Sequence, residues 1–314
     1  MKNYTIKKYN SEYFTIWNAF VSSSSNATFL FHRDFMEYHS DRFEDYSLLV
    51  FEDEKLISIL PANRVENTVF SHQGLTYGGF VFLDEMDENE VENGIKTAVE
   101  YLRKNEIKTL IVKEMISIYE RQKAIRINGF LANESQTVLD KKINLALDYR
   151  SDYKISKSKL KHYRRLQSEG FVIKKEADYD LFWTKVLEPL LNEKYNTKPV
   201  HSLEEIKSLA NKFPNNIEQY NLYIDDEILA GITIFKTQRV VKSQYGATTE
   251  KGKTYRALDY LFIYLIEMFA NNYEFFDMGT VDDDSELGYN IGLFNQKKEL
   301  GCDVFEQNFY ELLL

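Results

Sequence analysis

Two segments of the chain carry residues suited to proton transfer and to phosphate binding. The first is a glycine-rich loop at residues 72–79, which begins with a histidine and contains Gln73, Tyr77 and Gly78. The second runs from Tyr245 to Arg256; it is basic and leads into a helical pattern. Histidine, carboxylate and tyrosine side chains are common proton carriers in catalysis, and a helix start favours an anion. These segments are therefore the first candidates for a functional site.

Three residues are candidates for proton transfer. His72 is the first candidate base, because it is expected at the end of a strand beside the glycine-rich loop. Asp277, expected to follow a strand, is the second, and Tyr245 is a candidate acid or substrate contact. Each has an alternative. A lone histidine is more often structural, Asp277 can bond the backbone N–H groups of the next loop, and Tyr245 is one of 22 tyrosines that compete for core positions.

The basic turn at residues 251–256 is the candidate phosphate site. Its glycine allows close backbone approach, and its lysines and arginine can add charge-assisted hydrogen bonds. The predicted contacts of the phosphorylated ligand are Gly246, Ala247, Lys251, Gly252, Lys253, Thr254, Tyr255 and Arg256. The alternative is a lysine-rich surface turn in which Thr254 caps the following helix.

The elements that position these residues are expected twice, because the chain repeats itself. The run YTIKKY at residue 4 returns as FVIKKE at residue 171, and the apolar–acidic–apolar pattern at 46–60 returns at 220–235. SHQG at 71–74 matches SQYG at 243–246, and each is followed by a helical pattern (90–104, 255–271) and a strand pattern (108–112, 274–278). We therefore predict an α/β protein with mixed sheets, made of two similar domains at 1–150 and 151–314. A basic helix at about 151–168 would join them.

Composition restricts the function classes. A length of 314 residues suits two domains of about 150 residues each. The net charge of −10 argues against general nucleic-acid binding. Cys302 is the one cysteine, no apolar run suggests a signal peptide or a membrane span, and no cluster has the spacing of metal ligands. We therefore expect a cytoplasmic protein without a metal.

The element order resembles that of the GNAT superfamily of N-acetyltransferases, and two such domains in one chain resemble the Fem family (FemAB and FemX type). The resemblance is carried by residues 243–270, 273–280 and 292–301 in the second half, where Lys297 falls on the family's lysine. In the first half, 72–82 resembles the family's acceptor loop, and 154–165 resembles its inter-domain stretch. Fem proteins add amino acids to peptidoglycan precursors.

Two departures from the family pattern shift the expected donor. The chain has no room for the coiled-coil arm that binds tRNA in peptidoglycan members, which favours acyl-CoA over aminoacyl-tRNA. The Gln/Arg-x-x-Gly-x-Gly/Ala pyrophosphate signature of simple acetyltransferases is also missing, and Lys251-Gly-Lys-Thr-Tyr-Arg-Ala is the nearest match.

The resemblance implies how the site would be built. Two parallel strands, at 240–247 and 274–278, would separate so that their free backbone groups pair with the pantetheine arm of acyl-CoA. Only the second half is expected to bind CoA, because the segment before the corresponding first-half helix is acidic. The expected acceptor contacts are Gln73, Tyr77, Gly78, Thr280 and Lys297.

The favoured function is transfer of an acyl group from acyl-CoA to the amine of a nucleotide-linked amino sugar used for surface polysaccharide. One alternative is aminoacyl-tRNA-dependent transfer to a peptidoglycan precursor, and another is a non-catalytic tandem domain that binds a ligand or a partner. The expected partners are small molecules, not nucleic acid or a membrane. Pairing of the chain with itself as a homodimer is left open.

Overall fold

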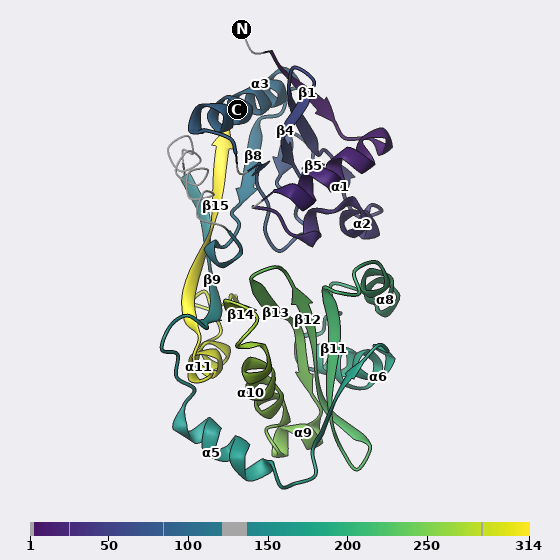
Figure 1. Cartoon of the computed structure of the whole chain (residues 1–314), viewed down its shortest axis with the longest axis vertical. Coiled ribbons are helices and arrows are strands. Elements are labelled where there is room, and N and C mark those ends of the chain that lie inside the picture. Colours follow the sequence, from purple (N-terminus) through teal and green to yellow (C-terminus); the bar gives the residue numbers. More distant parts are fainter. Residues whose placement is uncertain (1–2, 25, 84, 121–136, 284) are drawn as a thin grey trace. The chain divides into compact units, whose positions relative to one another are not determined.

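The computed structural model describes residues 3–24, 26–83, 85–120, 137–283 and 285–314 (Figure 1). The chain forms two compact units: residues 1–142 with 306–314, called unit 1, and residues 143–305, called unit 2. Two strands, β9 (Thr137–Asp148) and β15 (Asp303–Leu313), each run from one unit into the other. The expected assignment of acceptor and donor sides to residues 1–150 and 151–314 stays a prediction.

Unit 1 contains two sheets and one long helix. Its smaller sheet has the strand order β1-β3-β4-β7, and its other strands follow the order β15-β8-β6-β5-β2. The strands are β1 (Tyr4–Lys8), β2 (Glu44–Asp45), β3 (Leu48–Glu52), β4 (Lys55–Leu60), β5 (Asn63–Val65), β6 (Thr68–Phe70), β7 (Val81–Phe82) and β8 (Thr109–Lys113). The helices are α1 (Phe14–Ser23), α2 (Arg33–Met36) and α3 (Glu88–Lys104).

The long helix α3 closes the core of unit 1. Asp87 and Glu90 form a capping box at its start, which satisfies two N–H groups that the helix leaves without partners. Its apolar stripe, Ile95, Ala98 and Leu102, is fully buried against the β3–β4 hairpin and β8. The predicted first hairpin is confirmed, with β3 and β4 antiparallel.

Unit 2 repeats this plan around one mixed sheet with the order β10-β11-β12-β13-β14-β9. The new strands are β10 (Val172–Glu176), β11 (Ile217–Ile224), β12 (Glu227–Lys236), β13 (Val240–Thr248) and β14 (Phe275–Thr280). The helices are α5 (Lys157–Leu166), α6 (Asp180–Phe182), α7 (Glu188–Tyr195), α8 (Leu203–Lys212), α9 (Glu250–Thr254), α10 (Ala257–Phe269) and α11 (Ile291–Glu299), and a π-helix, η6, covers Trp183–Leu187. The second predicted hairpin is confirmed as β11 and β12.

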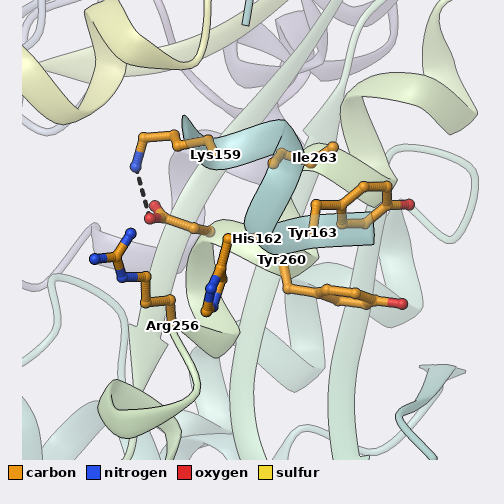
Figure 2. A pocket seen from close by; sticks show the side chains of 7 residues that line it. Lys159, His162, Tyr163, Arg256, Tyr260 and Ile263 are labelled. Carbon is orange, nitrogen blue, oxygen red and sulfur yellow. Dashed lines mark hydrogen bonds and ion pairs between the residues drawn. The ribbon is translucent and has the colours of Figure 1, made fainter. Parts of the chain in front are cut away.

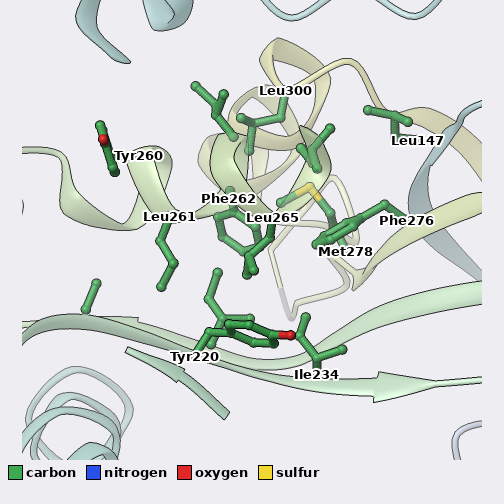
Figure 3. Packing of buried hydrophobic residues seen from close by; sticks show 14 of the residues in the cluster. Leu147, Tyr220, Ile234, Tyr260, Leu261, Phe262, Leu265, Phe276, Met278 and Leu300 are labelled. Atoms are coloured by element: carbon green, nitrogen blue, oxygen red, sulfur yellow. The ribbon is translucent and has the colours of Figure 1, made fainter. Parts of the chain in front are cut away.

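Helix α10 is the centre of the unit 2 core. Its sequence is apolar on nearly every face, which is typical of a buried helix. Figure 3 shows Leu261, Phe262 and Leu265 of α10 against Tyr220 and Ile234 of the sheet. Burial of each such side chain contributes about 1.5–3 kcal/mol. These contacts therefore hold α10 firmly against this face of the sheet.

Two helix predictions need correction. The helix expected at 255–271 is present as α10, but it begins at Ala257 because Arg256 adopts a left-handed backbone (φ 50°), and the short helix α9 before it was not expected. The basic helix expected at about 151–168 is shorter and covers Lys157–Leu166. It begins after Ser156, whose hydroxyl accepts the Lys159 N–H.

Candidate active site

Strands β13 and β14 separate in the way the family resemblance implies. They pair in parallel at Val240–Phe275, Val241–Phe276 and Lys242–Asp277, and no further pairing between them follows along these fully described strands. Beyond that point β13 stays hydrogen-bonded to β12, and β14 stays beside β9. One edge of β13, over residues 243–247, therefore does not pair with β14. A ligand with amide groups could pair with such an edge.

A buried ion pair sits at the last shared rung of the two strands. Lys242 Nζ lies 3.1 Å from Asp277 Oδ2, and the Asp277 side chain is 0% exposed. The other carboxylate oxygen accepts Asn144 Nδ2 at 2.9 Å and the Gly279 N–H at 2.7 Å. Asp277 is therefore a structural carboxylate that bonds the backbone after its strand, which is the alternative to a catalytic base given in the sequence analysis. A fully enclosed, multiply bonded carboxylate is poorly placed to take a proton from a substrate amine.

Lys297 of helix α11 hydrogen-bonds the residues of β14 that follow Asp277. Its Nζ donates to the carbonyl oxygens of Gly279 at 3.0 Å and Thr280 at 2.8 Å. The side chain is buried, and burial lowers its pKa to about 8, although nearby Asp277 acts in the opposite direction. From the sequence alone, Lys297 could either bind a substrate phosphate or be an exposed helix lysine; its burial shows that the second reading is wrong. The expected phosphate contact is also disfavoured, because two carbonyls already engage the ammonium group.

Tyr245 lies on the separated part of β13. Its hydroxyl contacts both the backbone N of His201 at 3.1 Å and His201 Nδ1 at 2.5 Å. The Trp183 ring packs against the Tyr245 ring, with centroids 5.2 Å apart. Burial raises the pKa of Tyr245 to about 12, so the hydroxyl is protonated at neutral pH. It can therefore act as a proton donor.

The basic turn is a real helix start, but its contacts differ from those expected. Thr249, not Thr254, caps α9: its hydroxyl accepts the Gly252 N–H at 3.0 Å. Gly252 is buried, and a Cβ there would lie 2.2 Å from the Leu229 carbonyl oxygen. The glycine thus serves close packing of α9 on β12, and its N–H is not available to a phosphate.

The charged groups of the turn are exposed. Lys251 pairs with Glu227, and Lys253 pairs with Glu250, in surface ion pairs that are readily exchanged for another anion. Arg256, at the junction with α10, is exposed as well. Of the other predicted contacts, Ala247 is buried, whereas Gly246 and Thr254 are exposed and Tyr255 is partly buried.

Helix α5 packs on the start of α10. Figure 2 shows the shallow hollow between them, lined by Lys159, His162, Tyr163, Arg256, Asp259, Tyr260 and Ile263. Lys159 is buried and bonds Asp259 at 2.6 Å, and it also lies 3.4 Å from Glu299. His162 Nε2 contacts the Tyr255 carbonyl at 3.0 Å. Helix α5 therefore ties together α10, the α9–α10 junction and α11.

The corresponding strands of unit 1 also separate, but the chain itself fills the space. Strands β6 and β8 pair in parallel as far as Phe70–Ile111. Beyond that, the Ser71 N–H donates to the Ile111 carbonyl, the Lys113 N–H donates to Ser71 Oγ, and the Gly78 N–H donates to the Lys113 carbonyl. Lys113 Nζ also donates to the Leu75 carbonyl at 2.6 Å. The backbone edge that stays open in unit 2 is thus satisfied internally in unit 1.

This self-filling explains the positions of the predicted acceptor contacts in unit 1. Tyr77 is 1% exposed, and its hydroxyl contacts Thr28 Oγ1 at 2.8 Å. Gly78 is buried, and a Cβ there would meet the Ser71 carbonyl oxygen at 1.8 Å. Both belong to the interior of unit 1, so direct substrate contact is disfavoured. Gln73 is exposed, although its side chain accepts Asn63 Nδ2 at 2.9 Å.

His72 is buried and forms a stacked pair with His39. The two rings lie 4.9 Å apart and 15° from parallel, and the Gly74 N–H donates to His72 Nδ1 at 3.2 Å. Burial lowers the pKa of His72 to about 3 and that of His39 to about 4. A base with so low a pKa takes up a proton poorly at neutral pH, which disfavours His72 as the general base.

The histidine pair predicts steep acid destabilisation. As the pH falls below the ordinary histidine pKa of 6.5, the unfolded chain binds two protons that the folded chain refuses until about pH 4 and 3. The free energy of unfolding should therefore fall, by up to about 2.7 kcal/mol per pH unit from these two residues. Urea unfolding at several pH values between 7 and 4 measures the slope.

A double variant that replaces both histidines isolates their contribution to this slope. In His39→Gln/His72→Asn, asparagine tolerates the left-handed backbone of residue 72 (φ 70°). In this variant, the difference in bound protons between the unfolded and folded chain should be smaller by about two, so the free energy of unfolding should depend less steeply on pH. An unchanged slope would contradict the assignment.

Unit 2 thus brings Tyr245, Gly246, the basic turn and Thr280 to the separated strands, while His72, Gln73, Tyr77 and Gly78 belong to unit 1. Sequence reasoning missed Lys242 and Asn144, which engage Asp277. It also missed His201 as the partner of Tyr245. A lysine inside the otherwise apolar start of β13 was the available signal for Lys242.

Two general features of the described residues bear on cofactors and membranes. No three histidine, cysteine, aspartate or glutamate side chains among them gather as a metal site would require. None of the helices in that part of the chain has the length and apolar character needed to cross a membrane.

Comparison with known proteins identifies the fold. No protein-family model and no curated protein sequence matches the chain. FemX has a TM-score of 0.68 at 11% identity, over 99% of this chain and 97% of that one. A domain assigned to a lysylphosphatidylglycerol synthetase from Agrobacterium fabrum has a TM-score of 0.59 at 11% identity (96% and 92%), and L-PGS from Bacillus licheniformis has 0.57 at 14% (97% and 92%). The chain therefore has the fold of FemX over nearly its whole length, as the resemblance stated from the sequence implies.

Proposed function

We propose that the protein is an N-acyltransferase whose donor lies along the separated strands of unit 2. The observation that carries this proposal is the end of β13–β14 pairing at Lys242–Asp277, which leaves residues 243–247 without pairing to β14. The pantetheine arm of an acyl-CoA carries amide groups that can pair with such an edge. Acyl-CoA is accordingly the proposed co-substrate.

The transfer needs few protein groups. A neutral amine attacks the thioester carbonyl, the new N–C bond forms, and the C–S bond breaks. Backbone N–H groups of the open edge stabilise the oxyanion, and Tyr245 gives its proton to the leaving thiolate and recovers one from solvent. The amine proton goes to water, since His72 and Asp277 are both buried. Alignment of amine and thioester then supplies much of the rate acceleration.

The ligand phosphates are placed at the basic turn. Lys251, Lys253 and Arg256 are exposed there and can bind a pyrophosphate. To do so, the two lysines would leave their surface ion pairs with Glu227 and Glu250. The proposed acceptor is a nucleotide-linked amino sugar, near Thr280. Support for it is by analogy with compact Fem-like proteins without a tRNA arm, and the net charge of −10 counts against a tRNA substrate.

A second candidate is aminoacyl transfer from a charged tRNA, as in the Fem family. Two observations favour it: the likeness to FemX extends over 99% of the chain, and α5 covers the start of α10, next to where CoA phosphates would lie. The outer face of α5 presents Lys157, Lys161, Arg164 and Arg165 to solvent. These cations could contact an RNA backbone.

Thermal unfolding with candidate ligands separates these functions. Acetyl-CoA at 100 times its Kd should stabilise the protein by about 2.7 kcal/mol, and a nucleotide amino sugar should add to that effect. Stabilisation by aminoacyl-tRNA without a CoA response would instead favour the second candidate. A response to a nucleotide ligand alone would indicate a non-catalytic binding protein.

Two exposed cations give matched variants for this test. Arg256→Gln should weaken acyl-CoA binding by about 5- to 10-fold through loss of one charge-assisted bond, whereas Lys161→Gln should leave it unchanged. If the ligand is RNA, Lys161→Gln should weaken binding and reduce its salt dependence. Equal CoA affinity in the wild type and Arg256→Gln would remove the phosphate assignment of the basic turn.

A further inference from the structure

One histidine, outside every role assigned so far, supplies two contacts to the Tyr245 hydroxyl, which the side chain of Gln244 also approaches. His201 is 4% exposed; its backbone N lies 3.1 Å from Tyr245 Oη, and its Nδ1 lies 2.5 Å from the same oxygen. From the sequence, His201 pairs with His32 as a repeat position before a helix, which indicates structure rather than catalysis. The contacts show that it faces the proposed acid.

The two contacts limit where the hydroxyl proton can point. The backbone N–H of His201 can only donate, so Tyr245 Oη must accept it. If Nδ1 also carries a hydrogen, Oη accepts twice and the O–H is free to donate to a substrate. If Nδ1 is bare, the O–H is used up in the bond to the ring. The tautomer of His201 therefore decides whether Tyr245 can serve as an acid.

Two contacts fix the backbone around His201. Ser202, the next residue, caps α8 in a capping box with Glu205, whose carboxylate accepts the Ser202 N–H at 2.8 Å. In addition, Trp183 Nε1 donates to the His201 carbonyl at 3.5 Å. Trp183 opens the π-helix η6, a rare form of helix that is frequent at functional sites.

The same tryptophan also fixes the tyrosine. Its ring meets the Tyr245 ring edge-on, at 78°, while the His201 ring lies at 89° to Tyr245. Tyr245 pairs across the sheet with Thr233 of β12, beyond the last rung that β13 shares with β14. The hydroxyl is thus held by a rigid frame on a strand that carries the open edge.

We propose that His201 is a positioning residue that keeps its Nδ1–H on Tyr245 Oη, so that the tyrosine proton is available to the leaving group. When Tyr245 gives up its proton, the two N–H groups of His201 remain aimed at the phenolate oxygen and stabilise it. Glu205 of α8 is the charged group that opposes the phenolate. This inference rests on the proposed acyl transfer and adds a second residue to its acid step.

NMR of protein labelled with 15N-histidine measures the tautomer directly. We expect His201 to carry its hydrogen on Nδ1 at neutral pH, and Tyr245→Phe to change that signal because the acceptor oxygen is gone. His201→Asn assigns the resonance by its disappearance. A hydrogen on Nε2 with a bare Nδ1 would overturn the proposal. This measurement needs no substrate, so failure of the acyl-transfer proposal and failure of the positioning proposal are separately visible.

Kinetics then test the role. His201→Leu should lower kcat by about 10- to 100-fold with little change in KM, because the acid step loses its orientation. His201→Asn should recover most of this loss, since the asparagine amide can place an N–H where Nδ1–H lies. Adding His201→Leu to Tyr245→Phe should cause no further loss. Equal impairment of the leucine and asparagine variants, at matched thermal stability, would show that His201 acts only in folding.

Discussion

Replacement of Asp277 by alanine is expected to lower the free energy of unfolding by about 3–5 kcal/mol. The carboxylate is fully buried and accepts bonds from Lys242, Asn144 and the Gly279 N–H. Its removal leaves the mostly buried Lys242 ammonium group without its counter-charge and the Gly279 N–H without its acceptor. Urea unfolding followed by circular dichroism measures the change.

Two further variants separate charge from hydrogen bonding. Asp277→Asn keeps an acceptor for Gly279 but removes the charge, so its cost should be smaller than that of alanine. Lys242→Met combined with Asp277→Leu removes both charges and should recover part of the loss, because an apolar pair can replace a buried ion pair at little cost. If Asp277 were a solvent-facing catalytic base instead, alanine would abolish activity and leave stability within about 0.5 kcal/mol.

This ion pair also explains how the strands are kept apart. Lys242 and Asp277 occupy the last rung, and Gly279 then turns with a positive φ of 77°. Asp277 binds the N–H of Gly279, and Lys297 binds the carbonyls of Gly279 and Thr280. The peptide groups after the rung are thus bonded to side chains, so they are not available to continue pairing with β13.

The repeat made the fold predictable from the sequence. The apolar runs at 46–60 and 220–235 have the spacing of hairpins, and both hairpins are present. The separation of β13 and β14 followed from resemblance to a known fold, because no local pattern marks where parallel pairing stops. The break at Arg256 was missed, since a left-handed arginine has no propensity signal.

The site was less predictable because burial decides its chemistry. His72, Asp277 and Lys297 were chosen by residue type and position, and all three are buried with specific partners. The sequence near them does not show that a loop fills unit 1, or that Lys297 points inward from a short helix. Tyr245 was chosen on similar grounds and lies on the separated strand. A register irregularity between β12 and β13, next to Tyr245, breaks the alternation of faces along β13, and the Tyr245 side chain meets Trp183 and His201.

The two units show how one duplicated plan yields two different edges. In unit 1 the loop at 71–78 returns to β8 and uses its backbone groups, with Lys113 held by the Leu75 carbonyl. In unit 2 the chain after β13 enters α9 at once, so no loop is available to fill the same place. This difference supports the proposed assignment of the donor to unit 2.

The last prediction separates packing from phosphate binding at the basic turn. Gly252→Ala should destabilise the protein by about 1–3 kcal/mol, although alanine favours helix by about 1 kcal/mol, because a Cβ would lie 2.2 Å from the Leu229 carbonyl and 2.3 Å from Thr248 Oγ1. The matched control is Gly246→Ala, where the nearest atom, of Phe262, is 3.4 Å from the added Cβ. This control should fold with nearly wild-type stability. Urea unfolding without any ligand measures both variants. If Gly252 exists to admit a phosphate, its alanine variant would instead be stable and lose only ligand affinity, whereas the contact with the Leu229 backbone requires a loss of stability before any ligand is added.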